Sequence, residues 1–220
     1  MNTLRLCIVV IICSLTFTAM GQAGVSALLP DSAKTIESFI PKGWILLDSA
    51  NGDYDKDNIK DIALVIVDSV LEKEGEVYRS VVVLKGTRYG YSRTAAGDSV
   101  ILCRGCGGIF GDPFDDIIFN GTVLTITHYG GSAWRWEYTD KFQFRKGKWV
   151  LIGETSNSYW NVKHCDKLDD FAGTNYKDTN FITGQFEEKQ ISENCKLLKN
   201  KKGKQKVEPL IALEKFTVVN

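Results

Sequence analysis

The pattern of hydrophobic and polar positions predicts β-strands along most of the chain after residue 40. Two apolar runs, residues 44–47 and 61–68, flank a polar loop. A third run, residues 78–84, is rich in Val and does not alternate with polar residues, which is typical of a strand buried on both faces. The sequence therefore predicts a sheet whose central strands are covered on both sides.

One short helix is expected before these strands. Asp31 or Ser32 can cap it, Pro41 ends it, and three apolar residues share one of its faces: Ile36, Phe39 and Ile40.

Two hairpins are expected in the middle of the chain. In the first, residues 117–119 and 122–128 flank Asn120-Gly121, a pair that favours the positive φ angles of a type I′ turn. In the second, Lys146-Gly147 forms the turn between residues 134–144 and 149–152. Because the hairpins are consecutive, we expect them to be neighbours in one antiparallel sheet.

Aromatic residues alternate with polar ones in the first strand of the second hairpin. The aromatic positions are Trp134, Trp136, Tyr138, Phe142 and Phe144. The pattern favours one aromatic face buried in the sheet core; the alternative is an aromatic platform for a sugar or a peptide.

Composition is that of an ordinary folded domain, with 44% hydrophobic and 25% charged residues among 220. The 27 basic and 27 acidic residues cancel, so nothing favours a nucleic-acid partner. We expect one mainly β domain over residues 22–220, a monomer built from antiparallel sheets and hairpins of the sandwich or propeller-fragment type.

The first 21 residues have the three parts of a secretory signal peptide. Arg5 precedes an apolar run over residues 6–17, and small residues precede Gln22. A retained membrane anchor is the alternative, but the run is shorter than the roughly 20 residues that span a bilayer. We therefore expect cleavage after residue 21 and a secreted or periplasmic protein.

Four cysteines follow this segment: Cys103, Cys106, Cys165 and Cys195. In an oxidising compartment an even number predicts disulfides, with three possible pairings of four cysteines. We expect Cys103 to pair with Cys106 and Cys165 with Cys195, because these are nearest in sequence. A redox-active pair and a four-cysteine zinc site are the alternatives.

The C-terminal part changes composition. Residues 196–206 are rich in Lys and lack aromatic residues, which predicts a solvated loop, with weak contact to an anionic surface as the alternative. Residues 209–213 are apolar again and are expected to dock as a final strand or turn.

The polar loop after residue 52 carries the most specific chemistry. Its carboxylates occupy positions 1, 3, 5 and 9, namely Asp53, Asp55, Asp57 and Asp61, and Ile59 at position 7 can add its carbonyl. Alternating residues of a tight loop can direct their oxygens inward, and calcium takes six to eight oxygen ligands. Asn58 stands where calcium loops usually have Gly, and Asn tolerates the left-handed conformation.

Residues 52–67, the Asp loop followed by the run Ile62 to Val67, resemble the calcium loop of FG-GAP or VCBS-type repeats, the units of integrin-like β-propellers. The resemblance extends to secreted bacterial proteins that carry one such unit. It implies Asp53, Asp55, Asp57 and Asp61 as side-chain ligands of one structural Ca²⁺, and Ile59 as a carbonyl ligand. The chain has one loop of this spacing and is too short for seven blades.

No catalytic motif is present, so no catalytic residue is assigned and no cofactor other than Ca²⁺ is expected. We expect a binding or interaction module whose partner is a protein or a glycan. The alternative is a hydrolase of the bacterial envelope that uses His128 with a nearby carboxylate such as Glu137 or Asp112. The surroundings of His128 distinguish the interaction module from the hydrolase, because an enzyme needs His128 to line a pocket beside a carboxylate.

Overall fold

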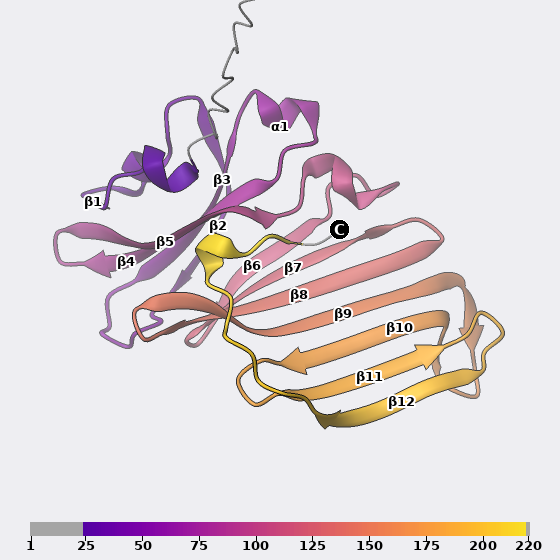
Figure 1. Cartoon of the computed structure of the whole chain (residues 1–220). Coiled ribbons are helices and arrows are strands. Elements are labelled where there is room, and N and C mark those ends of the chain that lie inside the picture. The colour runs from indigo at the N-terminus through magenta and orange to yellow at the C-terminus, as the bar shows by residue number, and fades with distance from the viewer. Residues whose placement is uncertain (1–23, 219–220) are drawn as a thin grey trace, which may run out of the picture.

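Two antiparallel sheets make up most of the protein in the computed structural model, which describes residues 24–218 (Figure 1). The first sheet has the strand order β1-β5-β4-β3-β2 and the second β12-β11-β10-β9-β8-β7-β6. The first contains β1 (Ser32–Ala33), β2 (Trp44–Gly52), β3 (Asp61–Asp68), β4 (Arg79–Thr87) and β5 (Gly90–Ile101). The second contains β6 (Phe114–Asn120), β7 (Val123–Gly131), β8 (Trp134–Arg145), β9 (Lys148–Cys165), β10 (Asp170–Asn180), β11 (Gln185–Ile191) and β12 (Leu197–Lys204). The expected mainly β class is confirmed.

Helical structure in residues 24–218 is limited to short turns. These are η1 (Val25–Leu28), η2 (Ile36–Phe39), α1 (Leu71–Glu74), η3 (Arg104–Gly107) and η4 (Leu213–Lys215). None of the helices in this part of the chain is long and apolar enough to cross a membrane. The expected signal peptide, residues 1–21, lies outside the described residues.

The helix expected between residues 31 and 41 is shorter than predicted. Ser32 and Ala33 are extended and pair with Ser92 and Tyr91 of β5, so neither Asp31 nor Ser32 caps a helix. Only the 3-10 turn η2 remains, and it places Phe39 in the core.

A shared hydrophobic core joins the two sheets. Val65 and Val83 of the first sheet lie in one cluster with Phe142 and Trp149 of the second, all fully buried. The apolar C-terminal segment enters the same cluster through Leu213, so the expected docking of residues 209–213 is confirmed, as the turn η4.

The opposite face of the first sheet is covered by the N-terminal turns. Leu64, Ile66, Val82 and Leu84 pack there against the N-terminal side chains Val25, Leu29 and Phe39. Strands β3 and β4 are therefore buried on both faces, as the continuous Val-rich run predicted.

Both expected hairpins form, and their strands β6 to β9 are consecutive in the second sheet. Lys146 and Gly147 have φ of 49° and 79°, so both turn residues are left-handed. In the first hairpin the turn is displaced by one residue, because Asn120 pairs with Val123. Gly121 and Thr122 are the turn residues, and only Gly121 has a positive φ, of 60°. The type I′ expectation for Asn120-Gly121 is therefore wrong.

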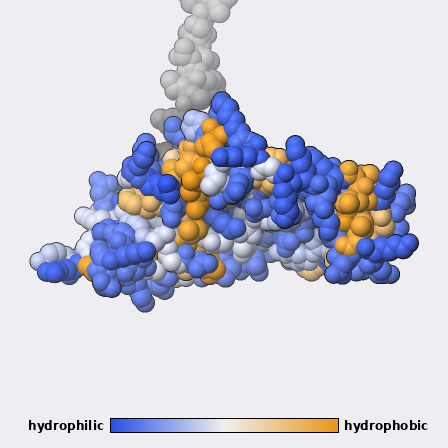
Figure 2. Space-filling view, turned by 90° about the horizontal axis from the view of Figure 1, so that it is seen from below, coloured by the Kyte–Doolittle hydropathy of each residue, from blue (hydrophilic) through white to orange (hydrophobic). Residues whose placement is uncertain are grey.

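The outer strands of the second sheet extend beyond the first sheet (Figure 1). Most of the Lys-rich segment is strand β12, so the solvated loop expected at 196–206 is wrong. Lys199 and Lys202 form ion pairs with Glu188 and Glu187 of β11. Lysines are common on edge strands because they discourage pairing with another chain. Figure 2, which shows the protein from below, has hydrophobic patches separated by a largely hydrophilic surface.

The cysteine pairing follows the expectation. Cys103 is bonded to Cys106, and Cys165 to Cys195. The second disulfide ties the long hairpin of β9 and β10 to the turn after β11, where Cys165 packs with Ala172 and Ile191.

Candidate metal site

The Asp loop lies where the edges of the two sheets meet. Strand β2 of the first sheet lies beside β6 of the second, so close that a Cβ on Gly52 would be 2.5 Å from the Phe119 ring. The loop, residues 53–60, then connects β2 to β3.

Tyr54 fixes this loop to the shared core. Its side chain is buried at 5% exposure, and its ring centroid lies 4.8 Å from that of Trp149 and 5.2 Å from that of Phe144. An order–disorder change in the loop would therefore disturb the packing between the sheets.

Asp61 is the fully buried member of the acidic group. One carboxylate oxygen accepts a hydrogen bond from the Tyr54 N–H and the other from the Gly86 N–H, both at 2.9 Å. Burial raises the pKa of Asp61, and the two hydrogen bonds oppose this effect. Gly86 is required at this position because a Cβ there would lie 2.1 Å from the Lys60 carbonyl oxygen.

Backbone N–H groups of the loop point toward two other carboxylates. Asp53 accepts from the N–H groups of Asp57 and Asn58 at 3.1 and 3.0 Å, and Asp57 accepts from Ile59 at 2.8 Å. Asn58 has φ of 63°, so the left-handed conformation expected for it is confirmed.

Lys85 of β4 supplies a positive charge at the mouth of the loop. Its ammonium group forms an ion pair with Asp55 and lies 3.1 Å from Asp57. These contacts raise the pKa of Lys85. The pKa of Asp57 is lowered, first by the hydrogen bond from the Ile59 N–H and then by Lys85.

Three of the four expected carboxylates converge. Asp53, Asp55 and Asp61 each place an oxygen within 4.8 Å of the other two. Asp57 lies outside this group and is directed to Ile59 and Lys85. The role of the Ile59 carbonyl stays a prediction.

Sequence reasoning did not identify Tyr54, Lys85 or Gly86 as parts of this site. A large aromatic residue inside an acidic turn was a local signal for Tyr54. Lys85 and Gly86 come from the next strand along the sheet, β4, and only the pairing of Ile62 with Leu84 brings them here.

His128 does not have the surroundings of a catalytic base. It is 1% exposed, and its Nε2 accepts a hydrogen bond from the Leu102 N–H at 3.2 Å. Burial, together with the positive charge of Arg79, lowers its pKa to about 4. The imidazole is thus neutral and enclosed.

Neither expected carboxylate partner can assist His128. Tyr138 is the residue opposite His128 in the sheet, so its neighbour Glu137 projects from the other face. Asp112 is held by two hydrogen bonds of 2.7 Å from Arg79. These contacts give the hydrolase alternative no support.

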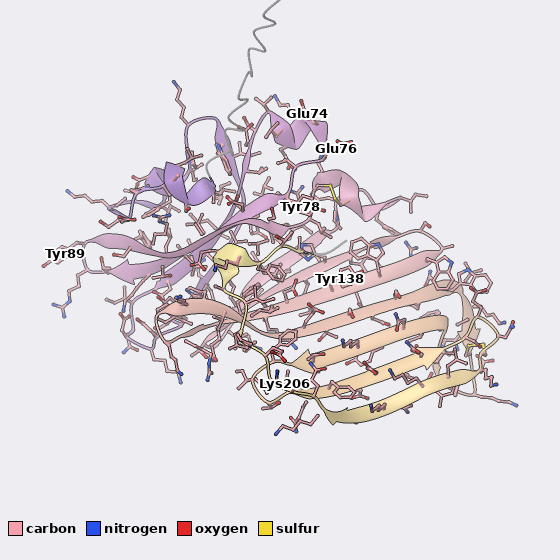
Figure 3. All side chains as sticks on the ribbon, in the orientation of Figure 1. Glu74, Glu76, Tyr78, Tyr89, Tyr138 and Lys206 are labelled. Atoms are coloured by element: carbon pink, nitrogen blue, oxygen red, sulfur yellow. A yellow bond between two sulfur atoms is a disulfide. The ribbon has the colours of Figure 1, made fainter. Side chains whose placement is uncertain are left out.

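The aromatic stripe of β8 is buried along only part of its length. Phe142 is fully buried, whereas Trp134 at the other end is 43% exposed and stacks on Trp160 with centroids 6.5 Å apart. Between them, Tyr138 lies near the middle of the second sheet (Figure 3) and stacks on Trp136. The expected buried aromatic face is therefore confirmed at the end of β8 that carries Phe142 and is wrong at the end that carries Trp134.

No family model matches the chain, and neither a curated protein nor a solved structure matches it. The site is therefore interpreted from its own geometry.

Proposed function

We propose that this chain is an exported calcium-binding β-domain that acts as a binding or interaction module, with the Asp loop as its cation site. The observation that carries the proposal is the convergence of Asp53, Asp55 and Asp61 within 4.8 Å. Two ligands on opposite sides of one Ca²⁺ are about 4.8 Å apart, since each Ca–O distance is roughly 2.4 Å. The three oxygens therefore fit around a single ion.

Further ligands are available in the same loop. Asp57 and the Ile59 carbonyl are the proposed additional donors, as the resemblance to FG-GAP units implies, and water completes the shell. Asp57 reaches an ion only by giving up its contact with Lys85.

Lys85 sets the affinity in this proposal. Its ammonium group partly neutralises Asp55 and Asp57, so an incoming cation competes with it. We expect a modest dissociation constant, near the 10⁻⁴–10⁻³ M of extracellular calcium modules.

The proposed ion stabilises the whole domain because Tyr54 couples the loop to the core. At a free calcium concentration about ten times the dissociation constant, that is roughly 1–10 mM, linkage gives roughly 1.4 kcal/mol. The melting temperature of the mature domain should therefore be higher in millimolar calcium than in chelator.

Three variants test the site by calcium-dependent melting and calorimetry. Asp55→Ala should abolish the calcium response, while Asp166→Ala, at a carboxylate 95% exposed and distant in sequence, should leave it unchanged. Lys85→Met should increase the calcium affinity, because the competing charge is removed. Superimposed melting curves with calcium and with chelator for the unmutated protein would mean that the loop is only an acidic turn neutralised by Lys85.

Two features support the interaction role and the location. The exposed Trp134 stacked on Trp160 offers an aromatic surface to a protein or glycan partner. The two disulfides fit an oxidising compartment. Contact of the Lys-rich strand β12 with an anionic surface is the weaker alternative, because Lys199 and Lys202 are already paired with glutamates.

A further inference from the structure

The outward face of the second sheet carries a cluster of ring and polar side chains around Arg135. Arg135 lies on β8 directly opposite Tyr159 of β9. It belongs to the set of odd-numbered residues of β8 that point away from the core, since Phe142, on the even-numbered face, is buried between the sheets. Phe110, from the loop after η3, lies over the guanidinium with its centroid 3.8 Å from Cζ.

The guanidinium of Arg135 has hydrogen-bond donors that the rest of the described chain does not use. Its Nε and Nη1 atoms are buried and have no hydrogen-bond partner among residues 24–218. Arg79, which is 1% exposed, donates four hydrogen bonds to Glu72 and Asp112. Enclosed N–H groups of a charged side chain are costly to leave unpaired, so Arg135 is arranged for an acceptor from outside the chain.

An unused acceptor lies on the same face. Asn157 is opposite Glu137, two pairs along from Arg135 and Tyr159 and therefore on the same face. Its Nδ2 donates to Glu137 at 3.0 Å, but its Oδ1 is buried without a hydrogen-bond partner in the described part of the chain. A ligand that satisfies both groups must bring an anionic acceptor for Arg135 and a hydroxyl donor for Asn157.

Aromatic rings border these polar groups. Phe110 packs against Tyr129 with centroids 5.8 Å apart, and Tyr159 stacks on Phe171 at 4.9 Å. Burial, with a hydrogen bond that the Tyr159 hydroxyl donates to Tyr129, raises the pKa of Tyr159 to about 12, so the hydroxyl stays protonated at physiological pH. Ring faces of this kind pack against the C–H face of a saccharide.

We propose that Tyr129, Arg135, Asn157 and Tyr159 form a binding site for a saccharide that carries a carboxylate, and that Phe110 covers this site in the free protein. Arg135 takes the carboxylate through Nε and Nη1, Asn157 accepts a hydrogen bond from a ring hydroxyl, and Tyr159 packs against the sugar ring. The nearby carboxylate of Glu137 repels a ligand with several charges, which favours a single carboxylate over a polyphosphate.

Phe110 must move for the ligand to reach Arg135. Its side chain is 48% exposed, and it lies between Gly108 and Gly111, which have φ of 68° and 75°. A Cβ on Gly111 would meet nothing within 4 Å, so the tip of this loop has free space beside it.

The site is independent of the Asp loop. Phe144, which contacts Tyr54 of that loop, is nine residues from Arg135 along β8, or about 30 Å at ~3.3 Å per residue. Loss of calcium binding therefore does not predict loss of this site.

The test is an NMR titration of the mature protein with methyl glucuronide. Methyl glucoside lacks the carboxylate, acetate lacks the sugar, and a short poly-glutamate peptide represents an acidic protein partner. Saturable shifts at Arg135 and Tyr159 are expected with the glucuronide, and at least tenfold weaker binding with the other three. Arg135→Gln should reduce glucuronide affinity at least tenfold, while Arg145→Gln, on the same strand but exposed, should not change it.

Equal binding of methyl glucoside and methyl glucuronide, tight binding of acetate or the peptide alone, or no effect of Arg135→Gln would each overturn the proposal. If Arg135→Gln does not fold, Phe110→Ala decides instead. Removing the covering ring should strengthen glucuronide binding several-fold, and unchanged or absent binding would count against the site.

Discussion

Asp140 is a carboxyl group enclosed by the second sheet, at 3% exposure. It lies opposite Ile126 of β7 and Glu154 of β9. Burial, with the nearby charge of Glu154, raises its pKa to about 7. The folded protein therefore binds this proton more tightly than the unfolded chain, whose Asp pKa is about 3.9.

The consequence is a loss of stability as pH rises. Between about pH 4 and pH 7 the folded state holds more protons at Asp140 than the unfolded state, so its contribution is present at the acidic end and lost through pH 7. Asp140→Asn should raise the free energy of unfolding at pH 8 by up to about 4 kcal/mol, the equivalent of three pKa units. Urea melts of the variant and the wild type at pH 5 and pH 8 measure this gain. An equal gain at both pH values would contradict the raised pKa of Asp140.

His128 changes the free energy of unfolding in the opposite direction to Asp140 over part of the same pH range. Its pKa of about 4 in the folded state lies below the ordinary value of 6.5, so folding favours the neutral imidazole. This contribution is present above pH 6.5 and lost as pH falls toward 4. His128→Gln, which keeps an acceptor for the Leu102 N–H, should remove the acid-dependent loss and uncover the trend of Asp140. If His128→Gln and the wild type have the same dependence of unfolding free energy on pH between pH 4 and 6.5, His128 does not titrate there.

At the scale of elements, burial decides which strands the sequence predicts. Strand β3 begins and ends where the apolar run does, at Asp61 and Asp68, because both of its faces are packed. Strands β10 to β12 have no such run, since polar residues occupy both faces of this part of the sheet. Their stability comes from backbone ladders and from cross-strand pairs such as Lys202 with Glu187, which hydrophobic patterning does not detect.

Only part of the candidate metal site could likewise be predicted from the sequence. The spacing of Asp53, Asp55 and Asp61 predicted their convergence, because the three belong to one turn. Lys85 follows Asp61 by 24 residues and reaches the loop through the β3–β4 ladder. A sequence pattern within the loop has no information about a charge that arrives from another strand.

The two disulfides should differ in their effect on stability. Cys103 and Cys106 are separated by 3 residues, and Cys165 and Cys195 by 30. In the chain-entropy model the larger loop contributes about 2 kcal/mol more. Urea melts of the paired variants C103S/C106S and C165S/C195S compare them, with thiol titration of the unreduced, denatured wild type expected to find no free thiol. A greater loss from the shorter loop would show that local packing outweighs chain entropy.

At the scale of the whole molecule, the C-terminal segment connects the two sheets. Ala212 forms a bridge with Val150 of β9, and Thr217 forms one with Ser99 of β5. Between these points Phe216 packs edge-on against Phe142 with centroids 5.1 Å apart. The two sheets are thus joined at the edge by β2 and β6 and across the core by this segment.

Leu213 is the residue on which this connection depends most. It is fully buried, and its carbonyl oxygen would be 2.6 Å from a Cβ on Gly97 of β5, so the segment cannot shift to fill a cavity. Leu213→Ala should lower the free energy of unfolding by about 2–5 kcal/mol, whereas Ile211→Ala, at a side chain 49% exposed, should change it by less than about 1 kcal/mol. Hydrogen exchange distinguishes a shared core from two separate ones: amides of β4 and β7 should lose protection together in Leu213→Ala, because Val83 and Leu124 lie in the same cluster. Loss of protection in one sheet alone would mean that the sheets unfold independently and that the C-terminal segment only rests on their surface.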